Sequence, residues 1–175
     1  PGWGFDLLKE NAKAAWNKEL GKIQVEGGTE TERILFYTAL YHSMIHPNIY
    51  MDADKKYRST NGQVYTSDGF KNYSNLSLWD TFRALHPLYT IINQQRTVDF
   101  IKTFLERYDH TGRLFIMEFD GAEGTTPPMI GTHSLSVIAD AYVKGIRGFD
   151  VAKAYDAMKK LADDSIRPDK ELYLK

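Results

Sequence analysis

Apolar side chains recur every three or four residues over much of this chain, a spacing that predicts α-helices. The first stretch runs to Leu20, with Asp6 as its expected cap. The second begins at Thr29-Glu30-Thr31-Glu32, a capping box in which hydroxyl and carboxylate satisfy each other's backbone N–H groups. We therefore expect about six helices, at about residues 6–20, 29–45, 78–93, 96–108, 132–145 and 150–164.

Residues 47–76 break the helical pattern and read as one long irregular loop. Within it, Asn61-Gly62 predicts a type I′ turn that joins two short strands into a hairpin. A loop of this length in a compact domain is usually either functional or disordered, and its mixture of polar and aromatic residues favours function. Farther on, Pro87 should kink or interrupt the helix predicted at 78–93.

Composition narrows the class of protein. The 175 residues suit one domain or a piece of a larger one, and 42% hydrophobic residues suffice for a core. The net charge of −1 argues against nucleic-acid partners, and no apolar run is long enough to span a membrane. There is no Cys for disulfides and no recognisable signal peptide. The abrupt start at Pro1-Gly2 suggests an excised or truncated fragment.

The segment from Ser77 to Leu88 holds the densest candidate chemistry. The Asp80 carboxylate accepts hydroxyl protons, the Arg83 guanidinium donates in a fixed fork, and the Trp79 indole covers the apolar face of a sugar ring. These three side chains together can bind a polyol. In a second interpretation, Asp80 and Arg83 form a structural ion pair on a helix and Trp79 belongs to the core.

Three segments carry a resemblance to a known family. They are Tyr-Thr-Ala-Leu-Tyr-His at 37–42, Trp-Asp-Thr-Phe-Arg-x-x-His-Pro-Leu at 79–88 and Met-Ile-Gly-x-His-Ser at 129–134. Their order resembles glycoside hydrolase family 92, which consists of calcium-dependent exo-acting α-mannosidases. The resemblance implies an all-α fold, part of a six-hairpin α/α barrel (toroid), with one long irregular loop and little strand. Residues 1–175 would supply about the first half of that barrel, without the family's β-sandwich domain.

The resemblance also suggests where the general acid lies. The family places an acid Glu just before Met-Ile-Gly, and without gaps Thr125 falls on that position here. A two-residue insertion would place Glu123 there instead, and a loop rich in Gly and Pro tolerates insertions. Trp79, Asp80 and Arg83 match sugar-contacting positions, and His133 either contacts substrate or orients a neighbour.

The remaining implications concern the whole enzyme. By family order, the catalytic base and the main calcium ligands are expected beyond Lys175, so no metal ligand is assigned in this chain. The implied activity is inverting, calcium-assisted removal of terminal α-linked mannose from mannose-containing glycans, with α-1,2 as the expected linkage and the rest of the catalytic domain as a partner. Export to a bacterial periplasm or cell surface is implied in the same way.

Three alternatives to this function remain open. A Thr at the acid position suits an inactive helical carbohydrate-binding fragment, or a hydrolase of mannosyl phosphodiesters, whose leaving group needs no proton. Another six-hairpin glycosidase, similar to trehalases or glucoamylases, shares the architecture. The Met-Ile-Gly-x-His segment favours the mannosidase interpretation over this last one.

Overall fold

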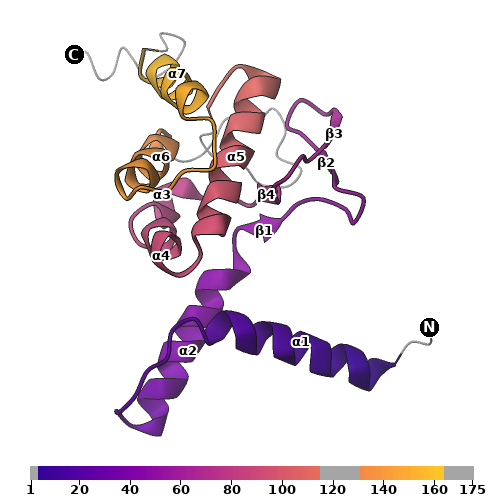
Figure 1. Ribbon diagram of the computed structural model, residues 1–175, viewed down its shortest axis with the longest axis vertical. Coiled ribbons are helices and arrows are strands. Elements are labelled where there is room, and N and C mark those ends of the chain that lie inside the picture. The colour runs from indigo at the N-terminus through magenta and orange to yellow at the C-terminus, as the bar shows by residue number, and fades with distance from the viewer. Residues whose placement is uncertain (1–3, 115–130, 164–175) are drawn as a thin grey trace. The chain divides into compact units, whose positions relative to one another are not determined.

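The computed structural model describes residues 4–114 and 131–163, and the chain divides into two compact units at His46. The first unit contains two helices, α1 (Phe5–Leu20) and α2 (Glu30–Ile45) (Figure 1). None of the described helices is long and apolar enough to cross a membrane.

The capping box predicted at the start of α2 is present. The Thr29 hydroxyl accepts from the Glu32 N–H at 3.2 Å, and the Glu32 carboxylate accepts from the Thr29 N–H at 2.7 Å. The Thr29 hydroxyl also donates to Glu32 Oε2 at 2.9 Å, and this bond and the one from the Thr29 N–H both lower the pKa of Glu32. The start of α1 differs from the prediction, because Gly4 is its N-cap and no side chain caps it. Asp6 instead lies in the first turn, where its charge favours the positive end of the helix dipole.

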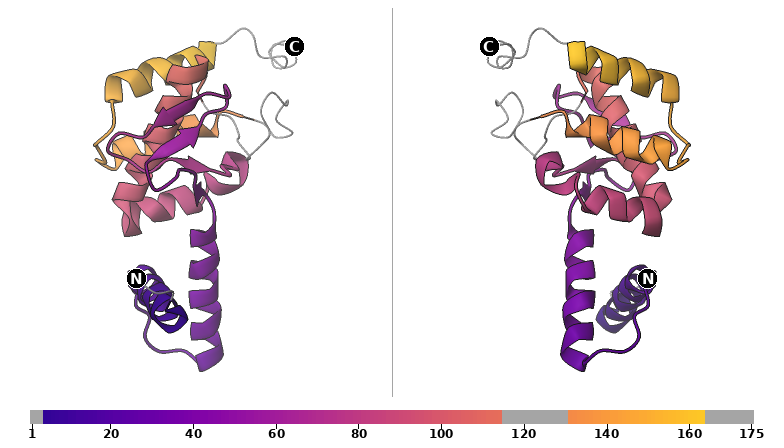
Figure 2. Two further views of the ribbon diagram at one scale, coloured as in Figure 1. Left: turned by 90° about the vertical axis from the view of Figure 1, so that its right-hand side faces the viewer. Right: turned by 90° about the vertical axis from the view of Figure 1, so that its left-hand side faces the viewer.

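The second unit is built around α5 (Figures 1 and 2). This helix contacts α4, α6, α7 and β4, and its buried residues include Phe100, Ile101 and Phe104. The elements of the unit are β1 (Asn48–Ile49), β2 (Lys56–Arg58), β3 (Val64–Thr66), β4 (Tyr73–Ser74), α3 (Leu78–Thr81), α4 (Leu85–Ile92), α5 (Gln94–Thr111), α6 (His133–Val143) and α7 (Val151–Asp163).

Residues 47–76 contain the predicted hairpin and a pairing that the sequence did not indicate. β2 pairs antiparallel with β3, with Tyr57 opposite Tyr65, and β1 pairs antiparallel with β4. The turn is not type I′, because only Gly62 of its central residues has a positive φ, at 77°. The Gly62 N–H donates to Ser59 O at 2.9 Å, and the Ser59 N–H donates to Gln63 O at 2.8 Å. This is a three-residue loop, a type I turn followed by a left-handed glycine.

The single helix predicted at 78–93 is two helices. The break lies at Phe82–Ala84, before Pro87 and not at it. Pro87 occupies the first turn of α4, where a backbone N–H has no partner within the helix, so proline is tolerated there. The hydroxyl of Thr90 donates to Pro87 O at 2.6 Å and stabilises the same turn.

Glycine follows two helices whose ends were expected at about residues 108 and 145 and lie at Thr111 and Val143. Gly112 follows α5 with φ 72°. After α6, Gly145 has φ 81° and donates to Tyr142 O, while Ile146 donates to Ala141 O, which together form a Schellman motif. Ile146 is buried, as the apolar residue after such a motif commonly is. These ends turn the chain so that α6 and α7 both pack on α5.

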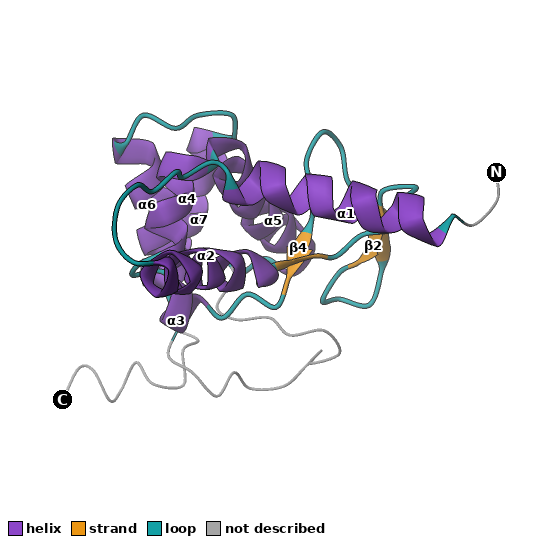
Figure 3. Ribbon diagram, turned by 90° about the horizontal axis from the view of Figure 1, so that it is seen from below, coloured by secondary structure: helices purple, strands orange, loops and turns teal. Residues whose placement is uncertain are grey.

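The described residues form a mostly helical structure with seven helices and four short strands (Figure 3). This agrees with the all-α class expected from the sequence, with little strand. The core of the second unit joins helices that are distant in sequence. It contains Tyr73, Leu76, Leu78, Tyr89, Val98, Phe100, Ile101, Phe104, Leu105, Leu114, Val137, Ile138, Ala141, Ile146, Phe149, Ala154, Ala157 and Leu161. Closure into a six-hairpin toroid stays a prediction.

Candidate active site

Asp80 is held by the residue that begins its own helix. Ser77 is the N-cap of α3, but its hydroxyl does not cap the helix and instead donates to Asp80 Oδ2 at 2.5 Å. The Ser77 carbonyl accepts from the N–H groups of Asp80 and Thr81 at 3.0 and 3.1 Å. The hydrogen bond from Ser77 therefore restricts the rotamer of a carboxylate that stays exposed to solvent.

Trp79 and Arg83 share the exposed side of the same segment. The Trp79 side chain is 41% exposed, which leaves indole surface open to a ligand and argues against the core interpretation. Arg83 Nη2 donates to Trp79 O at 3.2 Å. Among the described residues Arg83 forms no ion pair with Asp80, so the structural pair considered from the sequence is absent there. Trp79, Asp80 and Arg83 all retain exposed surface.

His133 contacts the segment from Ser77 to Leu88, although it is distant from that segment in sequence. It is the first residue of α6, which packs against α3. Its imidazole is 4.4 Å from the Phe82 ring, centroid to centroid, at an interplanar angle of 33°. Thr132, just before it, has φ 105°, a strained conformation for a β-branched residue. The structure thus brings two of the three segments together.

His86 belongs to the core and not to this surface. It is 2% exposed, packs edge-to-face on Phe100 at 5.1 Å, and both ring nitrogens are buried without a hydrogen-bond partner. Burial lowers the pKa of His86 to about 4, because the desolvated imidazolium is disfavoured. At neutral pH it is an uncharged packing residue.

The remaining predicted groups are not placed. Glu123 and Thr125, the two candidates for the acid, lie outside the described residues. Within the described ranges, no group of three or more His, Cys, Asp or Glu side chains could hold a metal ion. The described residues therefore do not fit the calcium that the family resemblance implies.

Two features of the structure were not predicted. Phe82 contacts both His133 and Arg83, and the Arg83 Cζ is 5.5 Å from the centroid of the Phe82 ring. The only sequence signal for these contacts was the position of Phe82 beside Arg83 in the motif.

The second feature is a cluster between the β2–β3 hairpin and α5. His110 stacks on Tyr65 at 3.5 Å, and its Nδ1 is 2.9 Å from the buried Ser59 Oγ.

Two pKa shifts accompany the hairpin cluster. Desolvation, opposed by the Glu106 carboxylate, lowers the pKa of His110. The Tyr57 hydroxyl donates to Glu106 at 3.1 Å, and burial with this carboxylate raises the pKa of Tyr57. Both groups therefore remain uncharged in neutral solution, which suits a buried contact between a hairpin and a helix.

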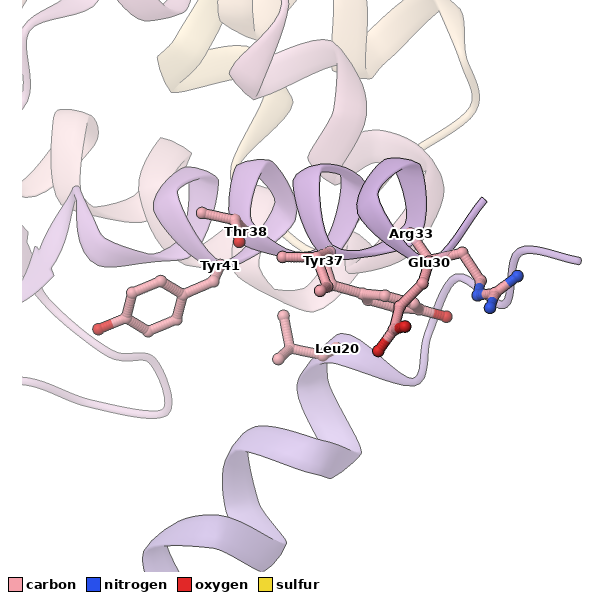
Figure 4. Close-up of a pocket in the computed structure, with 7 residues that line it drawn as sticks. Leu20, Glu30, Arg33, Tyr37, Thr38 and Tyr41 are labelled. Carbon is pink, nitrogen blue, oxygen red and sulfur yellow. The ribbon is translucent and has the colours of Figure 1, made fainter. Parts of the chain in front are cut away.

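A groove of about 630 Å³ lies in the first unit, away from the predicted site residues in sequence. Figure 4 shows Leu20 of α1 facing side chains of α2, while the Arg33 guanidinium points away. Arg33 donates to the carbonyls of Gly27 and Gly28, each at 3.1 Å. The lining residues are Leu20, Glu30, Arg33, Ile34, Tyr37, Thr38 and Tyr41.

Comparisons with known proteins identify the family of the chain. The sequence matches the glycosyl hydrolase family 92 catalytic domain over residues 1–173. The structure is similar to a family GH92 α-mannosidase from Bacteroides thetaiotaomicron, with 40% identity, a TM-score of 0.88, and coverage of 95% of this chain and 22% of that one. A GH92 inverting mannosidase from the same organism matches with 32% identity and a TM-score of 0.77, covering 88% of this chain and 21% of that one.

A curated relative is more distant. An uncharacterized secreted glycosidase from Arthroderma benhamiae is 28% identical over 164 residues, which are 92% of this chain and 17% of that protein. The chain thus spans about a fifth of the length of the proteins it matches. From the family match over nearly all residues and the similarity to two solved mannosidases, the chain belongs to glycosyl hydrolase family 92 and corresponds to part of a catalytic domain of that family.

Proposed function

We propose that this chain supplies part of the sugar-binding surface of an exo-acting α-mannosidase that releases terminal mannose from glycans. The observation that carries the proposal is the contact between Phe82 and His133, which joins the 79–88 and 129–134 segments. Around this contact Trp79, Asp80 and Arg83 keep exposed surface with the donor, acceptor and apolar face that a hexose needs.

The chemistry would divide between binding groups and two carboxyl groups. Inverting hydrolysis requires an acid that protonates the leaving oxygen and a base that activates water, roughly 6.5–9.5 Å apart. In this proposal Glu123 is the acid, with Thr125 as the alternative if the loop holds no insertion, and the base belongs to a segment beyond Lys175. The described side chains bind and orient the sugar.

Several finer properties follow from family resemblance. Calcium would be held by residues other than the described ones, since these offer no cluster for it. The partner would be the remainder of the barrel, of which residues 1–175 form about the first half. A terminal α-1,2 linkage and an exported location are part of the same proposal, and the secreted relative supports export.

The test measures mannose release from α-1,2-mannobiose, with calcium and with chelator, by this chain and by a longer chain extended past Lys175. We expect release by the longer chain and its loss on chelation. Asp80→Asn should raise KM by about tenfold, because the carboxylate then loses its charge-assisted hydrogen bonds to sugar hydroxyls.

Asp156→Asn is the matched control, because it makes the same change on an exposed position of α7. It should leave kcat and KM unchanged. An active longer chain whose KM is insensitive to Asp80→Asn would refute the binding role of Asp80. Activity toward a mannose-1-phosphate diester but not toward mannobiose would favour the phosphodiesterase alternative and place Thr125 at the acid position.

A further inference from the structure

The ring of Phe82 contacts Arg83, which the proposed function assigns to the sugar, and His133, which the family resemblance expects to contact substrate or orient a neighbour. Phe82 is the C-cap residue of α3, and its N–H donates to Leu78 O at 3.0 Å. The ring is partly buried against the core of the second unit. The hydrogen bond and the packing against the core thus hold Phe82 in place, so the ring can act as a rigid support for its neighbours.

The two polar neighbours reach the ring from different elements. Arg83 follows Phe82 in the chain, and its Cζ is 5.5 Å from the ring centroid, within the range of a cation–π contact. The His133 ring, at the start of α6, is 4.4 Å away and tilted by 33°. Phe82 is therefore the side chain that links the positions of these two groups.

Among the residues that the structure describes, little besides Phe82 orients His133. Its Nδ1 is buried without a hydrogen-bond partner, and no other described side chain makes a hydrogen bond or ion pair with the imidazole. A histidine that contacts a ligand normally has one nitrogen fixed by a hydrogen bond, which sets the direction of the other. Here an aromatic contact takes the place of that bond.

We infer that Phe82 is a positioning residue, whose ring sets the orientation of His133 and Arg83 toward the sugar. The identity of the ligand as a sugar rests on the proposed function. The orientation of His133 and Arg83 by the Phe82 ring does not depend on it. A leucine at this position would preserve apolar packing but lacks the flat face that both neighbours use. A tyrosine would preserve the face, so the two substitutions separate packing from orientation.

The first measurement is NMR of the imidazole C–H protons of His133 in the full chain. At 4.4 Å the Phe82 ring current should displace these resonances, so Phe82→Leu should move them toward random-coil positions and Phe82→Tyr should retain the shift. His133→Gln assigns the signals. Unfolding curves of both variants show whether each one folds. Unchanged His133 resonances in a folded Phe82→Leu variant would overturn the inference.

The second measurement is the steady-state kinetics of the same substitutions in the longer chain with α-1,2-mannobiose. We expect Phe82→Leu to raise KM about tenfold with a smaller change in kcat, and Phe82→Tyr to restore both, since displaced binding groups weaken substrate binding. A lost ring-current shift with unchanged KM would show that the contact is only structural and overturn the inference. Absence of mannose release by the unmodified protein would refute the proposed function, and the NMR result would still decide the orientation of His133.

Discussion

The buried His86 makes folding stability depend on pH. Its imidazole is 2% exposed, contacts Phe100, and has no hydrogen-bond partner for either nitrogen, so the folded chain accepts only its neutral form. Burial lowers its pKa to about 4, whereas an unfolded chain has a histidine pKa near 6.5. The perturbation that isolates this effect is His86→Met, which fills a similar volume with a flexible apolar side chain.

The magnitude follows from the two pKa values. Below pH 6.5 the unfolded chain binds a proton at His86, whereas the folded chain does not bind it until about pH 4. The free energy of unfolding is therefore highest above pH 6.5 and decreases as the pH falls from 6.5 to about 4. A pKa difference of this size corresponds to about 3 kcal/mol, at roughly 1.4 kcal/mol per pKa unit. His86→Met should remove this loss.

The assay is urea unfolding at several values between pH 7.5 and pH 4, followed by fluorescence and circular dichroism. Carboxylates and His110 titrate in both proteins, so the difference between wild type and His86→Met isolates His86. We expect the wild type to lose about 3 kcal/mol more than the variant over this range. His42→Met, which removes an exposed imidazole, is the control and should follow the wild type.

If the free energy of unfolding changed equally with pH in wild type and His86→Met, the reasoning would be refuted. It would mean that water or a polar group reaches the imidazole and stabilises its charged form in the folded chain. A variant that unfolds already at pH 7 would also contradict it, since replacing a buried polar group that lacks partners should cost little.

Two further predictions concern other sites. His110→Ala should destabilise the hairpin by about 2–4 kcal/mol, because the Tyr65 stack is lost and the buried Ser59 hydroxyl is left without a partner. Hydrogen exchange at the Ser59 amide measures this, and Asp109→Asn, which removes only an exposed ion pair, should have no such effect. Thr132→Gly should raise stability to urea by about 1 kcal/mol by relieving its positive φ, and a similar gain in Thr132→Ala would argue against strain.

Local signals in the sequence were enough to locate most elements. The capping box at Thr29 and the glycines after α5 and α6 act through backbone groups within a few residues of them, so their effect is independent of distant packing. The hairpin was predicted for the same reason, although its turn type was wrong. The break before α4 was misplaced, because a proline within the first turn is compatible with a helix.

The sequence alone therefore determined the helical class, most helix ends and the family, since these depend on short-range backbone chemistry and on motifs read directly. Only the tertiary structure decided which motifs meet. The Phe82–His133 contact, the docking of the hairpin on His110 and the burial of His86 arise from packing between segments distant in the chain. No local pattern specifies such contacts, because burial depends on the combined shape of several elements.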